Sequence, residues 1–145
     1  VIESDFSHDE LVEMIEGIDE NAVIVPPFLV QFSNPVEYAH WLALEDFKNK
    51  RNAVHSFSLQ WLLRLSAERR LSKALERTKC NGVFGIASEK KLSSNFLSGL
   101  GDMIKKDFSD EAALFYSITG GRVSSGYYLS FLIQERIAVS AGAED

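Results

Sequence analysis

The chain has almost no cysteine and no long apolar segment. Cys80 is the single cysteine, which excludes an internal disulfide and a cysteine-rich zinc site. No apolar run approaches the roughly 20 residues that a helix needs to cross a bilayer. The N-terminal segment SDFSHDE is acidic, unlike the basic start of a secretory signal. These absences predict a cytoplasmic protein that does not associate with membranes.

Basic residues are also missing from the first third of the chain. Residues 1–47 carry eleven acidic side chains and no Lys or Arg, whereas residues 48–91 carry eleven basic side chains and three acidic ones. Residues 92–145 carry seven acidic and four basic side chains, so the three segments contribute −11, +8 and −3 to the net charge of −6. Because a local patch concentrates oppositely charged ligands, the central segment indicates a face that binds a polyanion. The alternative is a solvated helix face whose charges pair with Glu68 and Glu76.

The composition is that of an ordinary globular domain. With 46% hydrophobic and 25% charged residues among 145, the chain is long enough to bury a core and resembles neither a disordered tail nor a fibre. Hydrophobic spacing and capping residues predict a first helix that starts at Ser7 or Asp9 and ends at 18, and further helices at 34–48, 56–65, 67–79, from near 88 to 99, at 109–118 and from 125. Apolar runs predict strands at 22–25, 82–87 and 136–140. This alternation predicts one α/β or α+β domain over residues 1–145, with several helices packed on a small mixed or antiparallel sheet.

The helix expected at 34–48 has a strong start pattern and an apolar stripe. Asn34 is placed to accept first-turn amides, Pro35 needs no donor at the first helical position, and Glu37 completes a capping box. The expected buried stripe is Val36, His40, Ala43, Leu44 and Phe47. A histidine on such a stripe indicates a half-buried side chain more than a ligand or a base.

The sequence carries no motif of an enzyme or of a cofactor site. Residues 99–101 and 120–126 contain glycines but lack the strand and the Lys-Ser/Thr of a phosphate-binding loop. None of the three histidines has metal-ligand spacing to another. We therefore expect no catalytic residue, no metal and no cofactor. One alternative stays open, a small hydrolase in which Cys80 pairs with a histidine distant in the sequence.

The central segment Asn52–Leu75 resembles the signature of a known family. Its distinctive pieces are His55-Ser56-Phe57, Leu62-Leu63-Arg64, Ser66-Ala67-Glu68-Arg69-Arg70-Leu71 and Lys73-Ala74-Leu75. In this order they are similar to the small kinase-binding subunit of the KEOPS complex, and the order of elements along most of the chain is similar to that of its archaeal members. Those members often carry a histidine in the preceding helix, where the best register places Leu42. No role is therefore transferred to His40.

The resemblance implies a noncatalytic accessory subunit. Such a subunit binds the atypical KEOPS protein kinase and reaches the other KEOPS subunits through it. It helps the complex to place threonylcarbamoyladenosine beside the anticodon of tRNA, and in archaeal relatives it also contacts tRNA, including the single-stranded CCA end. The resemblance thus predicts kinase binding and tRNA recruitment, with catalysis in another subunit.

Basic side chains of the central segment are the expected RNA-binding residues, because phosphates are held by charge. They are Lys48, Lys50, Arg51, Arg64, Arg69, Arg70, Lys73 and Arg77. His55 and Phe57 are further candidates, which stack on a base if they are exposed. The spacing of Phe57 also fits the core.

The last helix carries more apolar side chains than one buried face needs. Tyr127, Tyr128, Phe131 and Leu132 cover more than one side of it, so they are the expected kinase-binding residues. Burial in the core is the simpler alternative for each of them taken singly. A standalone RNA-binding module, which needs the basic face and no kinase, is the alternative function.

Overall fold

Seven α-helices and a small four-stranded sheet make up the described part of the molecule. The structure is a computed structural model that describes residues 1–118 and 126–140, without the side chains of residues 126 and 127. The strands are β1 (Ile2–Glu3), β2 (Val23–Val25), β3 (Val83–Ala87) and β4 (Asp102–Met103). The helices are α1 (His8–Glu16), the 3-10 helix η1 (Pro27–Val30), α2 (Ser33–Lys48), α3 (Phe57–Leu65), α4 (Leu71–Thr78), α5 (Ser94–Leu100), α6 (Ser109–Phe115) and α7 (Gly126–Ser140).

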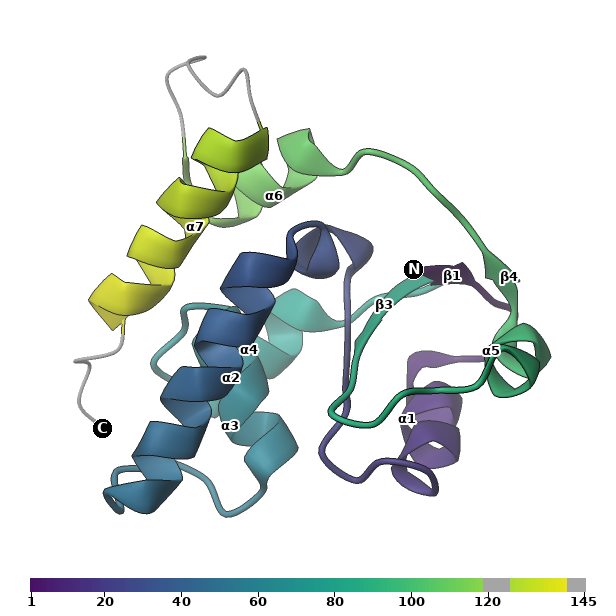
Figure 1. The fold of residues 1–145 in the computed structure, drawn as a ribbon, viewed down its shortest axis with the longest axis horizontal. Helices are drawn as coiled ribbons and strands as arrows, with labels where there is room; N and C mark the ends of the chain where they lie inside the picture. Colours follow the sequence, from purple (N-terminus) through teal and green to yellow (C-terminus); the bar gives the residue numbers. More distant parts are fainter. Residues whose placement is uncertain (119–125, 141–145) are drawn as a thin grey trace.

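The four strands form an antiparallel sheet with the order β2-β3-β1-β4. Strand β3 lies inside the sheet, where Ile86 pairs with Ile24 of β2 and Phe84 pairs with Ile2 of β1. The sheet, α1 and α5 occupy one end of the molecule, and α2, α3, α6 and α7 occupy the other (Figure 1). The predicted packing of several helices on a small mixed or antiparallel sheet is confirmed, and of the alternatives left open the fold is α+β and the sheet antiparallel.

Two clusters of buried side chains stabilise the two ends. The smaller cluster joins the sheet to α1 and α5, and the larger one joins the helices of the other end. Strand β2 contributes to both, because side chains alternate along a strand: Val23 and Val25 belong to the larger cluster and Ile24 to the smaller. The sheet is therefore shared by both halves of the core.

Serine side chains fix the starts of three helices. Ser7 forms a capping box with Glu10, in which the Ser7 Oγ accepts the Glu10 amide at 3.1 Å and the Glu10 carboxylate accepts the Ser7 amide at 2.8 Å. Ser56 caps α3 and Ser93 caps α5 in the same way, each accepting an amide three residues later. Such caps satisfy amides that have no partner inside the helix. Of the two starts predicted for the first helix, Ser7 is the one observed, and the start predicted at Ser56 is confirmed.

The strand predicted at 136–140 is wrong. These residues continue α7, which runs to Ser140. Branched residues favour strands only weakly, and here Ile137 follows Ile133 and Leu129 at a spacing of four, so it extends the buried stripe of the helix. Tertiary burial therefore outweighs the local preference.

Two further helix starts differ from the prediction. The helix predicted from 67 begins only at Leu71, because the chain reverses after α3. The helix predicted from near 88 begins at Ser94. The amides of Glu89 and Lys90 instead donate to the buried Asp19 carboxylate, at 2.7 and 3.0 Å, which holds this segment in a turn. A carboxylate from a distant loop thus competes with local helix formation.

Helix α2 has a different cap and a different buried face from those predicted. It begins at Ser33 without a side-chain cap, and Pro35 lies inside its first turn, where no amide donor is needed. Its fully buried residues are Pro35, Ala39, Ala43 and Asp46. Among the predicted stripe only Ala43 is fully buried, Leu44 is exposed, and the others are half-buried. Ala39 and Ala43 are small, which lets α3 pack closely against α2. The buried face of α2 therefore lies on the side of Asp46 and differs from the predicted stripe.

Candidate nucleic-acid interface

The turn between α3 and α4 presents two arginines of the signature segment. Ser66 ends α3, and Ala67 adopts a left-handed backbone conformation with φ of 56°. Residues other than glycine adopt this conformation rarely, and here the amides of Ala67 and Glu68 donate back to carbonyl groups of α3. The chain reverses before α4 begins, which leaves Arg69 and Arg70 exposed.

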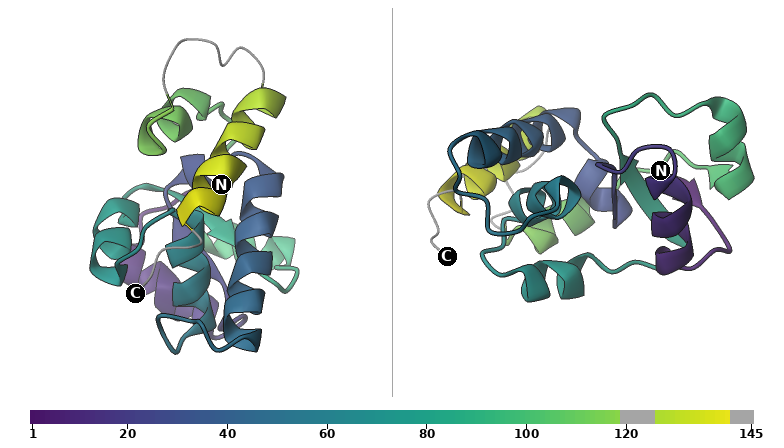
Figure 2. Two further views of the ribbon diagram at one scale, coloured as in Figure 1. Left: turned by 90° about the vertical axis from the view of Figure 1, so that its left-hand side faces the viewer. Right: turned by 90° about the horizontal axis from the view of Figure 1, so that it is seen from below.

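Eight basic residues and His55 are expected to bind RNA, and seven of these nine are exposed. They lie at the end of α2, in the loop to α3, in the α3–α4 turn and in the first turn of α4 (Figures 1 and 2). We call these residues the basic surface: Lys48, Lys50, Arg51, His55, Arg69, Arg70 and Lys73. None of them forms a salt bridge within the described residues. Their charges are therefore available to a ligand.

Arg64 is inside the protein instead. Its Nε and Nη2 atoms donate to the two oxygens of the Asp46 carboxylate at 2.7 and 2.6 Å. The Asp46 side chain is 1% exposed and that of Arg64 is 13% exposed. Gln60 donates a third hydrogen bond to the same carboxylate, at 2.7 Å. A buried pair of this geometry joins α2 to α3, so we assign Arg64 a structural role and leave it out of the basic surface.

Arg77 is also held by contacts within the protein. Its Nη1 forms a short ion pair with Glu68, and its Nη2 donates to the Phe115 carbonyl at 2.6 Å. The guanidinium lies 4.0 Å from the centre of the Phe115 ring. These contacts tie α4 to the α3–α4 turn and to α6. Of the pairing with Glu68 and Glu76 considered for the basic segment, the structure shows the Arg77–Glu68 pair across the turn, and within the described residues no member of the basic surface takes part.

The two candidate stacking residues differ in their surroundings. His55 is exposed in the α2–α3 loop. The Phe57 ring lies in a cluster with Phe47, Trp61 and His40, at centroid distances of 5.7, 6.2 and 5.2 Å. Phe57 therefore packs against the core, and of these two candidates only His55 keeps a ring that an unpaired base can reach.

A cleft of about 250 Å³ opens beside the α3–α4 turn. Three arginines line it, Arg69 from the turn, Arg77 from α4 and Arg136 from α7. Arg136 donates to the Ser117 carbonyl at 3.1 Å, which places its guanidinium at the wall. Guanidinium groups bind phosphate oxygens with directional hydrogen bonds, so the cleft suits an anion. No sequence spacing links Arg136 to the basic segment, and only the packing of α7 beside α6 brings it there.

Helix α7 presents an apolar stripe outward. Tyr128, Phe131 and Val139 are 46%, 52% and 74% exposed, whereas Leu132 is half-buried against the core. The side chain of Tyr127 lies outside the described residues. Val139 extends this stripe at helical spacing, and it was not among the expected residues because a strand was predicted there. The described part of the stripe is an apolar surface of the kind that proteins use for association.

Cys80 lies beside a histidine of the N-terminal segment, His8. Its Sγ lies 3.3 Å from the Nδ1 of His8, and the Cys80 amide lies 3.4 Å from the same nitrogen. Burial raises the pKa of the Cys80 thiol to about 12, and burial also lowers the pKa of His8. The thiol therefore stays protonated near neutral pH and the imidazole stays neutral. This pair has the geometry of a Cys–His nucleophile but not its ionisation.

Alkylation of Cys80 is expected to be slow. Because the thiolate is the reactive form, iodoacetamide should modify the folded protein at least about 100-fold more slowly than it modifies glutathione at pH 7.5. The rate should then rise about tenfold per pH unit up to pH 10, since the thiol pKa lies above this range. Mass spectrometry over time measures both. A rate that reaches a plateau below pH 8 would show an activated thiol and support the hydrolase alternative.

No family model matches the chain, and no curated protein matches it. Among residues 1–118 and 126–140, no three His, Cys, Asp or Glu side chains come together as metal ligands. In the same residues, no helix combines the length and the apolar character needed to span a membrane. The resemblance of the central segment and the geometry of the basic surface are therefore the basis for a functional proposal.

Proposed function

We propose that this protein is a noncatalytic subunit of the KEOPS complex that binds the atypical KEOPS protein kinase and helps to recruit tRNA. The proposal rests on the resemblance of residues 52–75 to the signature of that subunit. The observation that carries it is the basic surface, in which the signature segment and the residues just before it expose six Lys and Arg side chains without an ion pair in the described residues. Six basic side chains without an ion pair in that part of the chain, in a protein with a net charge of −6, favour a polyanion as ligand over a face that is only solvated.

A single strand of RNA is the proposed ligand of the basic surface. The charges of this surface lie before and after α3, from the end of α2 to the first turn of α4, and an extended phosphate chain is the kind of ligand that reaches charges spread in this way. The cleft lined by Arg69 and Arg136 lies beside the turn and accepts one phosphate of the strand. His55 supplies a ring for stacking on an unpaired base. The strand expected from the resemblance is the CCA end of tRNA.

The apolar stripe on α7 is the proposed surface for the kinase. Tyr128 and Phe131 do not line the arginine cleft, whereas Val139 does, so the proposed kinase surface centres on Phe131 and adjoins the RNA surface only at Val139. An aromatic side chain such as Phe131, which is half-exposed, is the kind of residue that contributes most to protein association.

Phe131→Asp is expected to weaken kinase binding by at least about 30-fold, because it places a charge in an apolar interface. The matched control is Met103→Asp on β4, which changes a residue that is 64% exposed at the other end of the molecule. Binding of the purified kinase is measured by calorimetry, and circular dichroism checks the fold of both variants. Equal binding by wild type and Phe131→Asp would exclude this stripe as the kinase surface.

The alternatives make different predictions. A standalone RNA-binding module retains tRNA and binds no kinase. A small hydrolase loses turnover when Cys80 is replaced by alanine and keeps its fold. The protonated state of the Cys80 thiol does not favour the second alternative.

A further inference from the structure

A second and larger recess lies away from the basic surface. It is a groove of about 600 Å³ between η1, the first half of α2, α3 and the end of β3. This volume is in the range of small-molecule sites. The wall is apolar, and its side chains are Val30, Val36, Trp61, Ile86 and Ala87. A ligand that enters the groove must therefore have an apolar body.

The two carboxylates of the groove face no lysine or arginine among the described residues that line it, and the one histidine of this lining, His40, contacts Glu89. Glu37 and Glu89 line it together with His40 and two serines, and it has no lysine or arginine among its lining residues. Glu37 is exposed on α2, and none of its side-chain atoms forms an ion pair in the described residues. An anion is therefore repelled from this groove, and a cation is attracted to it.

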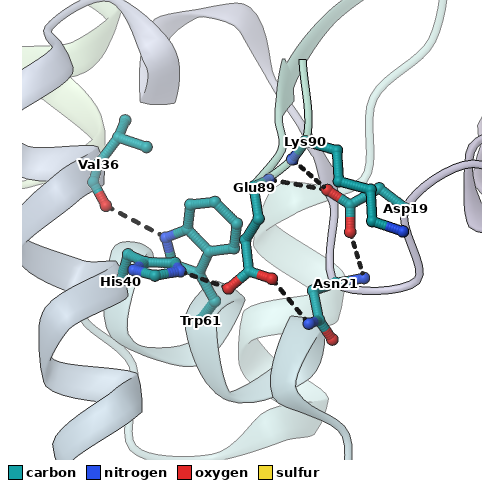
Figure 3. Close-up of polar contacts among 7 residues, drawn as sticks. All are labelled: Asp19, Asn21, Val36, His40, Trp61, Glu89 and Lys90. Atoms are coloured by element: carbon teal, nitrogen blue, oxygen red, sulfur yellow. Dashed lines mark hydrogen bonds and ion pairs between the residues drawn. The ribbon is translucent and has the colours of Figure 1, made fainter. Parts of the chain in front are cut away.

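A chain of hydrogen bonds fixes the Glu89 carboxylate (Figure 3). The Nε2 of His40 lies 2.6 Å from one oxygen, and the Nδ2 of Asn21 donates to the other at 2.8 Å. The backbone of Glu89 is held in turn, because its amide donates to Asp19 at 2.7 Å. Each carboxylate oxygen has two lone pairs, so each keeps an acceptor position after these contacts. Glu89 thus presents a charge whose orientation is already set.

The imidazole of His40 is fixed as well. Its ring lies 4.7 Å from the Trp61 ring at an angle of 76°, and the Trp61 indole donates to the Val36 carbonyl at 3.1 Å. Figure 3 shows these groups side by side, with Glu89 between His40 and Asn21. The Glu89 carboxylate and the apolar wall at Trp61 are therefore held in place through His40. Few side chains need to become ordered when a ligand binds, which lowers the entropic cost of binding.

We infer that this groove binds an organic cation, a primary amine carried on an apolar body, with the ammonium against Glu89 and Glu37 and the body against Val36 and Trp61. An ammonium has three donors and no acceptor, which matches two carboxylates in a groove that neither lysine nor arginine of the described residues lines. The amine comes from a free small molecule or from a lysine side chain. This inference does not depend on the proposed role in KEOPS.

The test uses phenethylamine, phenylacetate and ethylbenzene as probes of the same size with positive, negative and no charge. Each is titrated into the labelled full chain, and NMR follows the Trp61 indole N–H and the methyl groups of Val36 and Ile86. Phenethylamine should shift these signals and bind at least about tenfold more tightly than phenylacetate. Equal affinities for the amine and the acid, or no shift with any probe, would overturn the inference.

Two variants locate the charge. Glu37→Gln should weaken phenethylamine binding several-fold, whereas Glu111→Gln on α6, an exposed residue with the same change of charge, should leave it unchanged. Equal effects would overturn the assignment to this groove. A capped Leu-Lys-Leu peptide distinguishes the sources: tighter binding of the peptide assigns the groove to a partner's lysine, and tighter binding of phenethylamine assigns it to a small molecule.

Discussion

Reversing the charges of Arg69 and Arg70 to glutamate is expected to weaken tRNA binding by at least about 100-fold. Both side chains are exposed on the α3–α4 turn, and Arg69 also lines the arginine cleft. Each lost contact to a single strand should also lower the salt dependence by roughly 0.7 in the slope of log K against log salt. The double variant should therefore lower the slope by about 1.4. Fluorescence anisotropy of labelled tRNA at several salt concentrations measures affinity and slope together.

The matched control reverses Lys105 and Lys106, which follow β4. Both residues are exposed, and the double variant changes the net charge by the same amount. They lie on the long connection between β4 and α6, away from the α3–α4 turn (Figure 1). Their reversal should leave tRNA affinity within about threefold of wild type, because distant surface charges are screened. Equal losses in the two variants, or a wild-type slope near zero, would contradict a localised RNA surface.

Replacing Arg64 by methionine is expected to lower the free energy of unfolding by about 3–5 kcal/mol. The substitution keeps most of the side-chain volume but leaves the buried Asp46 carboxylate without its two-point partner. Gln60 remains as a neutral donor and does not compensate the charge. Urea denaturation followed by circular dichroism measures the difference.

Two comparisons separate the ion pair from other effects of removing an arginine. Arg70→Met removes an exposed arginine and should change stability by less than about 0.5 kcal/mol. Adding Asp46→Asn to Arg64→Met removes the unpaired charge and should recover part of the loss. A loss below about 1 kcal/mol for Arg64→Met would contradict the structural role assigned to Arg64.

The parts of the fold that were predictable are those set by neighbouring residues. Ser7 and Glu10 form a capping box three residues apart, and Ser56 begins a helix with a clear apolar period. The apolar run at 83–87 forms β3 because both flanks carry turn residues. Such features depend on spacing within one or two helical turns, which a sequence displays directly.

The unpredicted parts depend on residues that are distant in the chain. Strands β1 and β4 have two residues each, and they exist because they pair across a sheet whose members are far apart in sequence. The helix predicted from near 88 is displaced by Asp19, and the C-terminal strand is displaced by the packing of Ile137. Local propensity is weaker than these tertiary contacts.

The candidate site shows the same division. Sequence analysis located the basic segment, and seven of the nine residues expected there to bind RNA are exposed. Sequence analysis did not separate these from Arg64 and Arg77, because the acids that bind them come from another helix and from across a turn. Charge counts treat every arginine as equal, whereas burial and pairing decide which charges reach a ligand. Arg136 shows the converse, since it joins the cleft from a segment with no excess of basic residues.

The measurement that tests the central claim most directly is a pull-down with this chain from an extract that contains KEOPS, before and after nuclease treatment. Mass spectrometry identifies the retained proteins, and sequencing identifies the retained RNA. The proposed role predicts that the atypical kinase is retained in both conditions and that tRNA is retained only before nuclease. Retention of tRNA without the kinase would contradict a KEOPS subunit and support a standalone RNA-binding module, and retention of neither would contradict both.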